Sequence, residues 1–261
     1  MRWMLTNLSI RDVWRKLRTR VIPNAKYLGR SRIRQCRACD HLSLIVALGP
    51  DGEFQICIRC RANLRYELIA GYLREMSAPM SLLDVLELDP ASPLGPIFRG
   101  ARSYTRSYFR EHVAPGTNRA DGAVCQDITR LTFPDDSLDL IVSSDVLEHV
   151  PDAGAAFRES ARVLRPGGAH IFTVPPRSAT IRRAYMHDGQ LVHLTSPEYH
   201  SDPLSPSGIL AFWDYGPDLA SKVDTAGLIV TVVRGPEGVE GRVVWMARKA
   251  VNGRQQETNS L

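Results

Sequence analysis

Short apolar runs alternate with helical patterns over most of the chain from residue 80 onward. Buried-strand character is found at 82–88, 123–128, 138–143 and 169–174. Before the last of these runs, 157–164 has apolar residues at a helical spacing and is followed by the helix-stopping sequence Arg165-Pro166-Gly167-Gly168. This alternation predicts an α/β fold with a doubly wound, mostly parallel sheet and helices on both faces.

The last apolar segments of the chain depart from this alternation. A helical pattern over 219–226 ends at Gly227, and two apolar runs follow at 228–233 and 242–247. The short connection between them contains Gly235-Pro236-Glu237-Gly238. Two strands joined so closely pair antiparallel. We therefore expect a mostly parallel sheet whose last strand is antiparallel.

Two cysteine pairs near the N-terminus have the spacing of a metal site. Cys36 and Cys39 form one pair, Cys57 and Cys60 form the other, and 17 residues separate the pairs. The run 42–48, a Gly-Pro turn and the run 53–56 read as two strands with one pair of cysteines at each end. Four thiolates at this spacing predict a small zinc-ribbon-like module holding one structural Zn²⁺. Two disulfides or unrelated buried cysteines are the alternatives, and Cys125 is expected to stay free in a core strand.

The N-terminal arm and the rest of the chain have net charges of opposite sign. Eleven Lys or Arg and one acid precede residue 38, a net charge of +10, so the remainder carries +5 − 10 = −5. The arm, 1–35, has the pattern of an amphipathic basic helix that could contact an anionic membrane surface or RNA, or pack as a solvated helix on the zinc module or on a neighbouring subunit. No apolar stretch reaches the ~18 residues that span a bilayer, and no signal-peptide core is present. A cytoplasmic location, with the arm at a membrane surface as a variant, is the expectation.

The most specific motif covers 127–150 and continues through 162–168. It reads Asp127-Ile128, then Phe133-Pro134-Asp135-Asp136-Ser137-Leu138-Asp139, then Leu147-Glu148-His149-Val150, then Arg162-Val163-Leu164-Arg165-Pro166-Gly167-Gly168. This segment resembles the class I S-adenosylmethionine (SAM) dependent methyltransferases of the type 11 family. The resemblance implies a Rossmann-like, seven-stranded sheet with an antiparallel last strand. It also implies a SAM cofactor, bound where ligands bind in doubly wound sheets, at the carboxyl ends of the strands.

The resemblance also implies a set of cofactor contacts. They are Glu87, Leu88, Asp89, Asp127, Ile128, Ser144 and Asp145, with Asp127 near the adenine amino group and Ser144 and Asp145 near the methyl group. The first loop departs from the family pattern, because Asp89-Pro90-Ala91 replaces its glycines. Ser92 and Pro93 suit an N-cap and first helical residue, so a helix start is expected there. The next strand lacks the acid that holds the ribose, and Glu111 lies farther along than the family pattern has it.

The segment 175–215 is too long for a plain connection and is interpreted as a lid over the site. It carries three histidines, His187, His193 and His200. We take His200 as the base for a hydroxyl acceptor and Asp202 as its orienting partner, with a structural role as the alternative for any of the three. His149 is expected to be structural.

These expectations divide the chain and give it three candidate functions. The expected units are the arm 1–35, the zinc module 36–61, a connecting helix 62–79, the methyltransferase domain 80–250 with its lid 175–215, and a disordered tail 251–261. The favoured function is methylation of a hydroxyl, or of an amine, on a small molecule or glycan. An RNA base methyltransferase and a binding or scaffold protein that has lost the cofactor are the alternatives. The sequence does not specify the oligomeric state.

Overall fold

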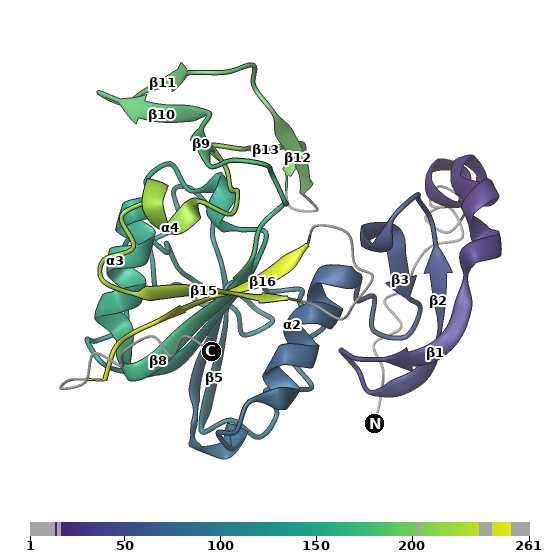
Figure 1. Cartoon of the computed structure of the whole chain (residues 1–261), viewed down its shortest axis with the longest axis horizontal. Coiled ribbons are helices and arrows are strands. Elements are labelled where there is room, and N and C mark those ends of the chain that lie inside the picture. Colours follow the sequence, from purple (N-terminus) through teal and green to yellow (C-terminus); the bar gives the residue numbers. More distant parts are fainter. Residues whose placement is uncertain (1–13, 15–16, 203–204, 235–241, 252–261) are drawn as a thin grey trace, which may run out of the picture.

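The computed structural model describes residues 14, 17–202, 205–234 and 242–251. A three-stranded sheet near the N-terminus and a seven-stranded sheet lie on opposite sides of α2 (Leu64–Glu75), and small hairpins lie above the larger sheet (Figure 1). Residues 1–13 of the predicted arm, the predicted turn at 235–238 and the tail from 252 lie outside the described residues. Within the described part of the chain, no helix combines the length and hydropathy that a membrane crossing needs.

The seven-stranded sheet has the order β15-β16-β8-β7-β4-β5-β6. Its strands are β4 (Asp84–Glu87), β5 (Ser103–Tyr108), β6 (Val124–Cys125), β7 (Leu138–Ser144), β8 (Leu164–Thr173), β15 (Ile229–Arg234) and β16 (Val243–Arg248). Strands β4 to β8 pair in parallel, and β16 pairs antiparallel with both β8 and β15. The strand order reverses between β4 and β7, which is where a doubly wound sheet binds its ligand. This topology confirms the predicted fold class.

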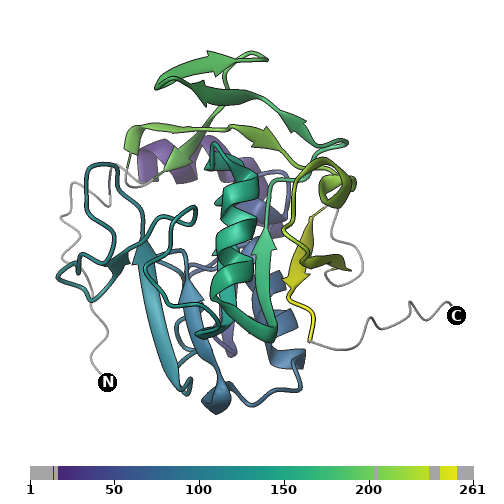
Figure 2. The ribbon, with the colours of Figure 1, turned by 90° about the vertical axis from the view of Figure 1, so that its left-hand side faces the viewer.

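Both faces of the central strand β7 are covered. Leu140 and Val142 pack in one core with α2, whereas Ile141, which points the other way, packs in a second core with Leu86 and Val163. The helix α3 (Ala153–Val163) covers one face of the sheet (Figure 2). Its Phe157 packs beside Phe172 of β8, which lies on the same face as Ile141. The continuous apolar run 138–143 therefore reflects a strand that is buried on both sides.

The region between α3 and β8 differs from the expectation. The strand begins at Leu164, directly after the helix, so Pro166-Gly167-Gly168 lies inside the strand instead of before it. Gly167 has φ +84°, and a Cβ on Gly168 would lie 2.9 Å from the carbonyl oxygen of Arg165. The β7–β8 register shifts between Leu138 and Leu140 at this point. The glycines therefore bend the strand rather than end the helix.

Three further expectations are corrected. Residues 88–102 form turns, so the helix expected from Ser92 and Pro93 is wrong. Prolines at 90, 93 and 96 remove backbone donors from three positions of this segment, and the hydroxyl of Ser92 instead accepts from the amide of Leu94 at 3.0 Å. The expected helix 219–226 shortens to α4 (Leu219–Lys222), and the expected strand 123–128 shortens to β6.

The N-terminal module is a three-stranded antiparallel sheet of β1 (Arg32–Cys36), β2 (His41–Ala47) and β3 (Gln55–Cys57). The two predicted strands correspond to β2 and β3, with the short helix η3 (Gly52–Phe54) between them, and β1 is additional. Before it come the helical turns η1 (Leu17–Val21) and η2 (Ile22–Arg30). The buried residue Ile45 of β2 belongs to the same core as Leu68 and Ile69 of α2. The module and the large sheet therefore share α2 as a common wall.

The predicted lid is built from three small antiparallel pairs. They are β9 (Ile181–Arg182) with β14 (Trp213–Asp214), β10 (Ala184–His187) with β11 (Gln190–His193), and β12 (Tyr199–Asp202) with β13 (Ser205–Leu210). Figures 1 and 2 both show these pairs, drawn in green, on one side of the large sheet. They follow β8 in sequence and return the chain to α4.

Candidate active site

The first loop, after β4, holds three of the predicted cofactor residues. Glu87 is 1% exposed, and the hydroxyl of Tyr104 on the neighbouring strand β5 donates to its carboxylate. Burial raises the pKa of Glu87 from its ordinary value of 4.5 to about 7. The amide of Leu88 continues the sheet by donating to Val142 at 2.9 Å. The sequence alone did not indicate that Glu87 has a tyrosine partner.

Asp89 is held from outside the sheet. The hydroxyl of Tyr66 on α2 donates to one oxygen of Asp89, and the amide of Ala91 donates to the other at 2.8 Å. In place of a glycine loop, this chain thus has a loop that is held by a hydrogen bond from Tyr66 of α2.

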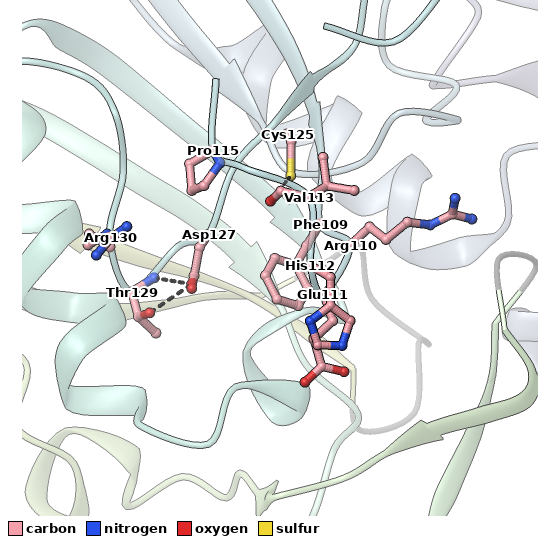
Figure 3. A pocket seen from close by; sticks show the side chains of 10 residues that line it. All are labelled: Phe109, Arg110, Glu111, His112, Val113, Pro115, Cys125, Asp127, Thr129 and Arg130. Carbon is pink, nitrogen blue, oxygen red and sulfur yellow. Dashed lines mark hydrogen bonds between the residues drawn. The ribbon is translucent and has the colours of Figure 1, made fainter. Parts of the chain in front are cut away.

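A cavity of about 460 Å³ opens beyond the ends of β5 and β6. Figure 3 shows Asp127 and Glu111 among the side chains that line it. One oxygen of Asp127 accepts from both the amide and the hydroxyl of Thr129, at 2.8 and 2.7 Å, which fixes the carboxylate at the cavity wall. Glu111 was expected to lie too far along the chain, but the turn after β5 brings it to the same cavity. Ile128, the next predicted contact, is buried behind this wall.

Asp145, after β7, lies in a buried network of charges. It has φ +52°, and its two carboxylate oxygens contact Arg65 at 2.8 Å and Arg242 at 2.9 Å. Arg242 also lies 2.7 Å from Glu53 of the N-terminal module, and the side chains of Arg242 and Asp145 are 7% and 11% exposed. Burial raises the pKa of Glu53. No sequence pattern indicated these two arginines, because they come from α2 and from the residue before β16.

The neighbouring Ser144 is buried at the same strand end. Its hydroxyl accepts from the hydroxyl of Thr173 at 3.3 Å, and Thr173 also donates to Asp145 at 3.0 Å. The residues predicted from the sequence as cofactor contacts thus all lie at or just after strand ends on one edge of the sheet.

The lid is fixed to the turn that follows β7. The amide of Phe212 donates to the carbonyl of Glu148 at 2.7 Å, and the hydroxyl of Tyr215 donates to the carbonyl of Leu147 at 3.2 Å. Nδ1 of His149 lies 2.9 Å from the carbonyl oxygen of Leu210. These contacts bring the second half of the lid against the turn η5 (Leu147–His149).

A cluster of one carboxylate and two imidazoles lies at this junction. Glu148 is 1% exposed, and its Oε1 lies 3.7 Å from Nε2 of His149 and 3.8 Å from Nδ1 of His200. Among the described residues, no group donates a hydrogen bond to either carboxylate oxygen of Glu148. Burial raises the pKa of Glu148, and the neighbouring carboxylates of Glu148 and Glu198 raise the pKa of His200.

The predicted lid residues lie in different environments. His200 enters this cluster, and its Nε2 lies 3.1 Å from Glu198, which Arg177 also contacts. The side chain of Asp202 lies outside the described part of the structure, so its pairing with His200 stays a prediction. His187 and His193 lie on the exposed hairpin β10–β11. Sequence reasoning missed Glu148, although the motif Leu147-Glu148-His149-Val150 contained it.

The four cysteines of the N-terminal module fit a tetrahedral ion. One sulfur from each lies within 4.8 Å of the others, and the sulfurs of Cys36 and Cys60 are 3.6 Å apart. Sulfurs bound to one tetrahedral Zn²⁺ at ~2.3 Å would be roughly 3.8 Å apart. The observed separation is far longer than a disulfide, and Cys125 is buried in β6 as expected.

Comparison with known proteins identifies part of this architecture. Residues 102–172 match the family model of the methyltransferase domain. That segment runs from the start of β5 into β8 and contains Asp127, Asp145 and Glu148. These residues therefore lie in a methyltransferase-like segment.

Individual relatives match over limited lengths. Demethylmenaquinone methyltransferase of Mycolicibacterium paratuberculosis is 40% identical over 79 residues, 28% of this chain and 34% of that protein. The protein of the same name from Mycolicibacterium vanbaalenii is 31% identical over 123 residues, 44% of this chain and 53% of that protein. The chain thus covers between a third and about half of these curated relatives.

A solved structure of a SAM-dependent methyltransferase from Mesorhizobium loti is also similar. It is 16% identical with a TM-score of 0.45, covering 69% of this chain and 97% of that chain.

Proposed function

We propose that this protein is a SAM-dependent methyltransferase that methylates a hydroxyl group of a small molecule or glycan. The observation that carries the proposal is the cavity of about 460 Å³ beyond the ends of β5 and β6, which the acids Glu111 and Asp127 line within the methyltransferase-like segment. The lid adds imidazoles to the same edge of the sheet. Such a combination suits a polar cofactor on one side and a proton-bearing acceptor on the other.

The residues at this edge fit the cofactor's polar parts. Asp127 can accept a hydrogen bond from the adenine amino group, and Glu111 on the same cavity can accept from the ribose hydroxyls. Glu87, Leu88 and Asp89 would border the cofactor from the first loop, and Ile128, Ser144 and Asp145 from the other strand ends. When bound, the cofactor supplies an electrophilic methyl group on a positively charged sulfur.

The chain's own contribution to transfer is alignment and deprotonation. The leaving thioether is neutral and needs no acid, so holding the acceptor oxygen in line with the methyl carbon is the main requirement. We propose that the lid cluster promotes loss of the proton from the acceptor hydroxyl and that this step requires His200. Glu198 orients the ring of His200, and Asp202 remains proposed as a further partner.

We propose that Cys36, Cys39, Cys57 and Cys60 bind one structural zinc ion. The support is the convergence of four sulfurs with no disulfide among them. Metal analysis of protein purified without added zinc should give one zinc per chain, and changing all four cysteines to serine should remove it and unfold the module. A ratio near zero, with normal folding of the serine variant, would contradict the zinc site.

Calorimetry with SAM, followed by transfer of a labelled methyl group, tests the function. We expect saturable SAM binding and label on a hydroxylated acceptor. The panel should include glycans, quinols, because the relatives are named demethylmenaquinone methyltransferases, and RNA. Absence of SAM binding would favour a scaffold protein. Label on RNA, with retention that weakens steeply with salt, would favour the RNA alternative through the basic arm.

A further inference from the structure

Two histidine rings and one buried carboxylate converge from distant parts of the chain. Glu148 and His149 belong to η5, whereas His200 belongs to β12 of the lid. One ligand atom from each lies within 4.8 Å of the other two. The folding of the lid onto η5 is what brings them together.

In each ring, the nitrogen that points away from Glu148 has a hydrogen-bond partner, and that partner determines whether the nitrogen carries a hydrogen. Nδ1 of His149 faces the carbonyl oxygen of Leu210 at 2.9 Å, and a carbonyl only accepts, so Nδ1 carries the hydrogen. Nε2 of His200 faces the carboxylate of Glu198 at 3.1 Å, so it also donates. The inner nitrogens, Nε2 of His149 and Nδ1 of His200, are therefore the lone-pair positions of the neutral rings. Both face Glu148.

With both rings neutral and Glu148 ionised, two lone pairs and a carboxylate are directed at one point and repel each other, and either a proton or a bound cation between them relieves the repulsion. Glu148 is 1% exposed, and the described residues give its carboxylate oxygens no hydrogen-bond donor. A buried carboxylate in this condition is costly unless a positive charge compensates it. The buried His170 is different, because its two nitrogens meet the hydroxyls of Ser143 and Ser160 at 2.9 and 3.3 Å. Ordinary packing of a buried histidine therefore does not explain the arrangement at Glu148.

We propose that Glu148, His149 and His200 bind a divalent transition-metal ion that keeps open coordination positions. The separations of 3.7 and 3.8 Å between Glu148 and the two rings are close to those of neighbouring ligands on an ion ~2.0–2.2 Å away, which are roughly 3–3.6 Å apart. Two imidazoles and one carboxylate suit Zn²⁺, Mn²⁺ or Fe²⁺. Glu198 and the carbonyl of Leu210 supply the outer hydrogen bonds that orient metal-bound histidines.

The ion would act on the acceptor. A hydroxyl oxygen bound at an open position loses its proton to solvent water more readily, because the ion stabilises the alkoxide. An oxygen lone pair then forms the bond to the methyl carbon, and the carbon–sulfur bond breaks with its electron pair on sulfur. In this step His200 holds the ion and does not itself take the proton. This role rests on the function proposed above, whereas the binding of the ion does not.

Titration of the full-length protein with Mn²⁺, followed by electron paramagnetic resonance of the free ion, tests the site. Mn²⁺ prefers nitrogen and oxygen ligands, so the four-cysteine site does not compete for it. We expect one Mn²⁺ per chain for the parent. Glu148→Gln and His200→Ala should weaken binding at least tenfold, and His193→Ala, on the exposed hairpin, should bind like the parent.

The controls separate this site from folding and from the methyltransferase function. Circular dichroism and zinc content of each variant report folding, and Glu148→Gln preserves side-chain shape. If the parent binds neither Mn²⁺ nor a second zinc ion, or if both variants bind like the parent, the metal site is refuted and His200 remains a metal-free base. Mn²⁺ binding without SAM binding would refute the proposed function and support the metal site.

Discussion

Asp145 and Glu148 lie three residues apart after the same strand, but their carboxylates have opposite surroundings. Asp145 has an arginine on each oxygen, at 2.8 and 2.9 Å. Glu148 is more deeply buried, yet the described residues donate no hydrogen bond to its carboxylate. A carboxylate that is paired with two arginines has a structural role, because its charge is already balanced. An uncompensated one, facing imidazole lone pairs, is suited to bind a cation.

Glu87 shows a third way to bury a carboxylate. It has the hydroxyl of Tyr104 as donor, and burial raises its pKa to about 7. A proton then removes much of the charge near neutral pH. One edge of the sheet thus holds carboxylates balanced by arginines, by a proton and, in our proposal, by a metal ion.

Removing an arginine from the Asp145 network should have the largest effect. Arg242→Met leaves Asp145 and Glu53 partly uncompensated in a buried site, so we expect a loss of about 3–5 kcal/mol in the free energy of unfolding. Arg158→Met is the control, because Arg158 pairs with Asp224 where both side chains are more than half exposed. That change should cost about 0–1 kcal/mol in urea unfolding. Equal losses in the two variants would show that the Asp145 network does not stabilise the fold.

The pH dependence of stability tests Glu87. Its pKa is about 7 in the folded protein against an ordinary 4.5, so between these pH values the unfolded chain ionises first. The free energy of unfolding should therefore fall by about 1.4 kcal/mol per pH unit over this range, roughly 3 kcal/mol in total, and level off above pH 7. Glu87→Gln should lack this contribution in urea unfolding from pH 4 to 8. Parallel curves for parent and variant would contradict the raised pKa.

Matched amide substitutions compare the two acids after β7 directly. Asp145→Asn removes the charge that balances two arginines and should cost about 2–3 kcal/mol. Glu148→Gln removes an uncompensated charge and, without added divalent cations, should leave stability equal to or above that of the parent. Thermal unfolding with and without Mn²⁺ checks this. We expect the ion to raise the melting temperature of the parent and of Asp145→Asn, but not that of Glu148→Gln.

The last comparison concerns Asp127, a partly exposed acid at the cavity. Asp127→Ala should weaken SAM binding about ten- to a hundredfold, the loss of one charge-assisted hydrogen bond of roughly 1.5–3 kcal/mol. Asp127→Asn can still accept from Thr129 and should lose less affinity. Calorimetry on both variants measures the difference. An alanine variant that titrates like the parent would make Asp127 only a turn residue.

Local sequence pattern was sufficient to predict the sheet and the edge at which we propose that the cofactor binds. The alternating apolar runs, the antiparallel final pair and the motif 127–150 depend on local periodicity and on strand ends, which neighbouring residues specify. The cysteine spacing likewise predicted that Cys36, Cys39, Cys57 and Cys60 converge, because pairs at the ends of adjacent strands meet.

Only the tertiary structure decided which charges meet at that edge. Arg65 and Arg242 reach Asp145 from positions 80 and 97 residues away, and His200 reaches Glu148 through the folding of the lid. The prolines of the first loop prevented the expected helix, and the turn after β5 brought Glu111 to the cavity. Periodicity carries no information about such contacts, because they depend on how separate elements pack and on where each buried charge finds a partner.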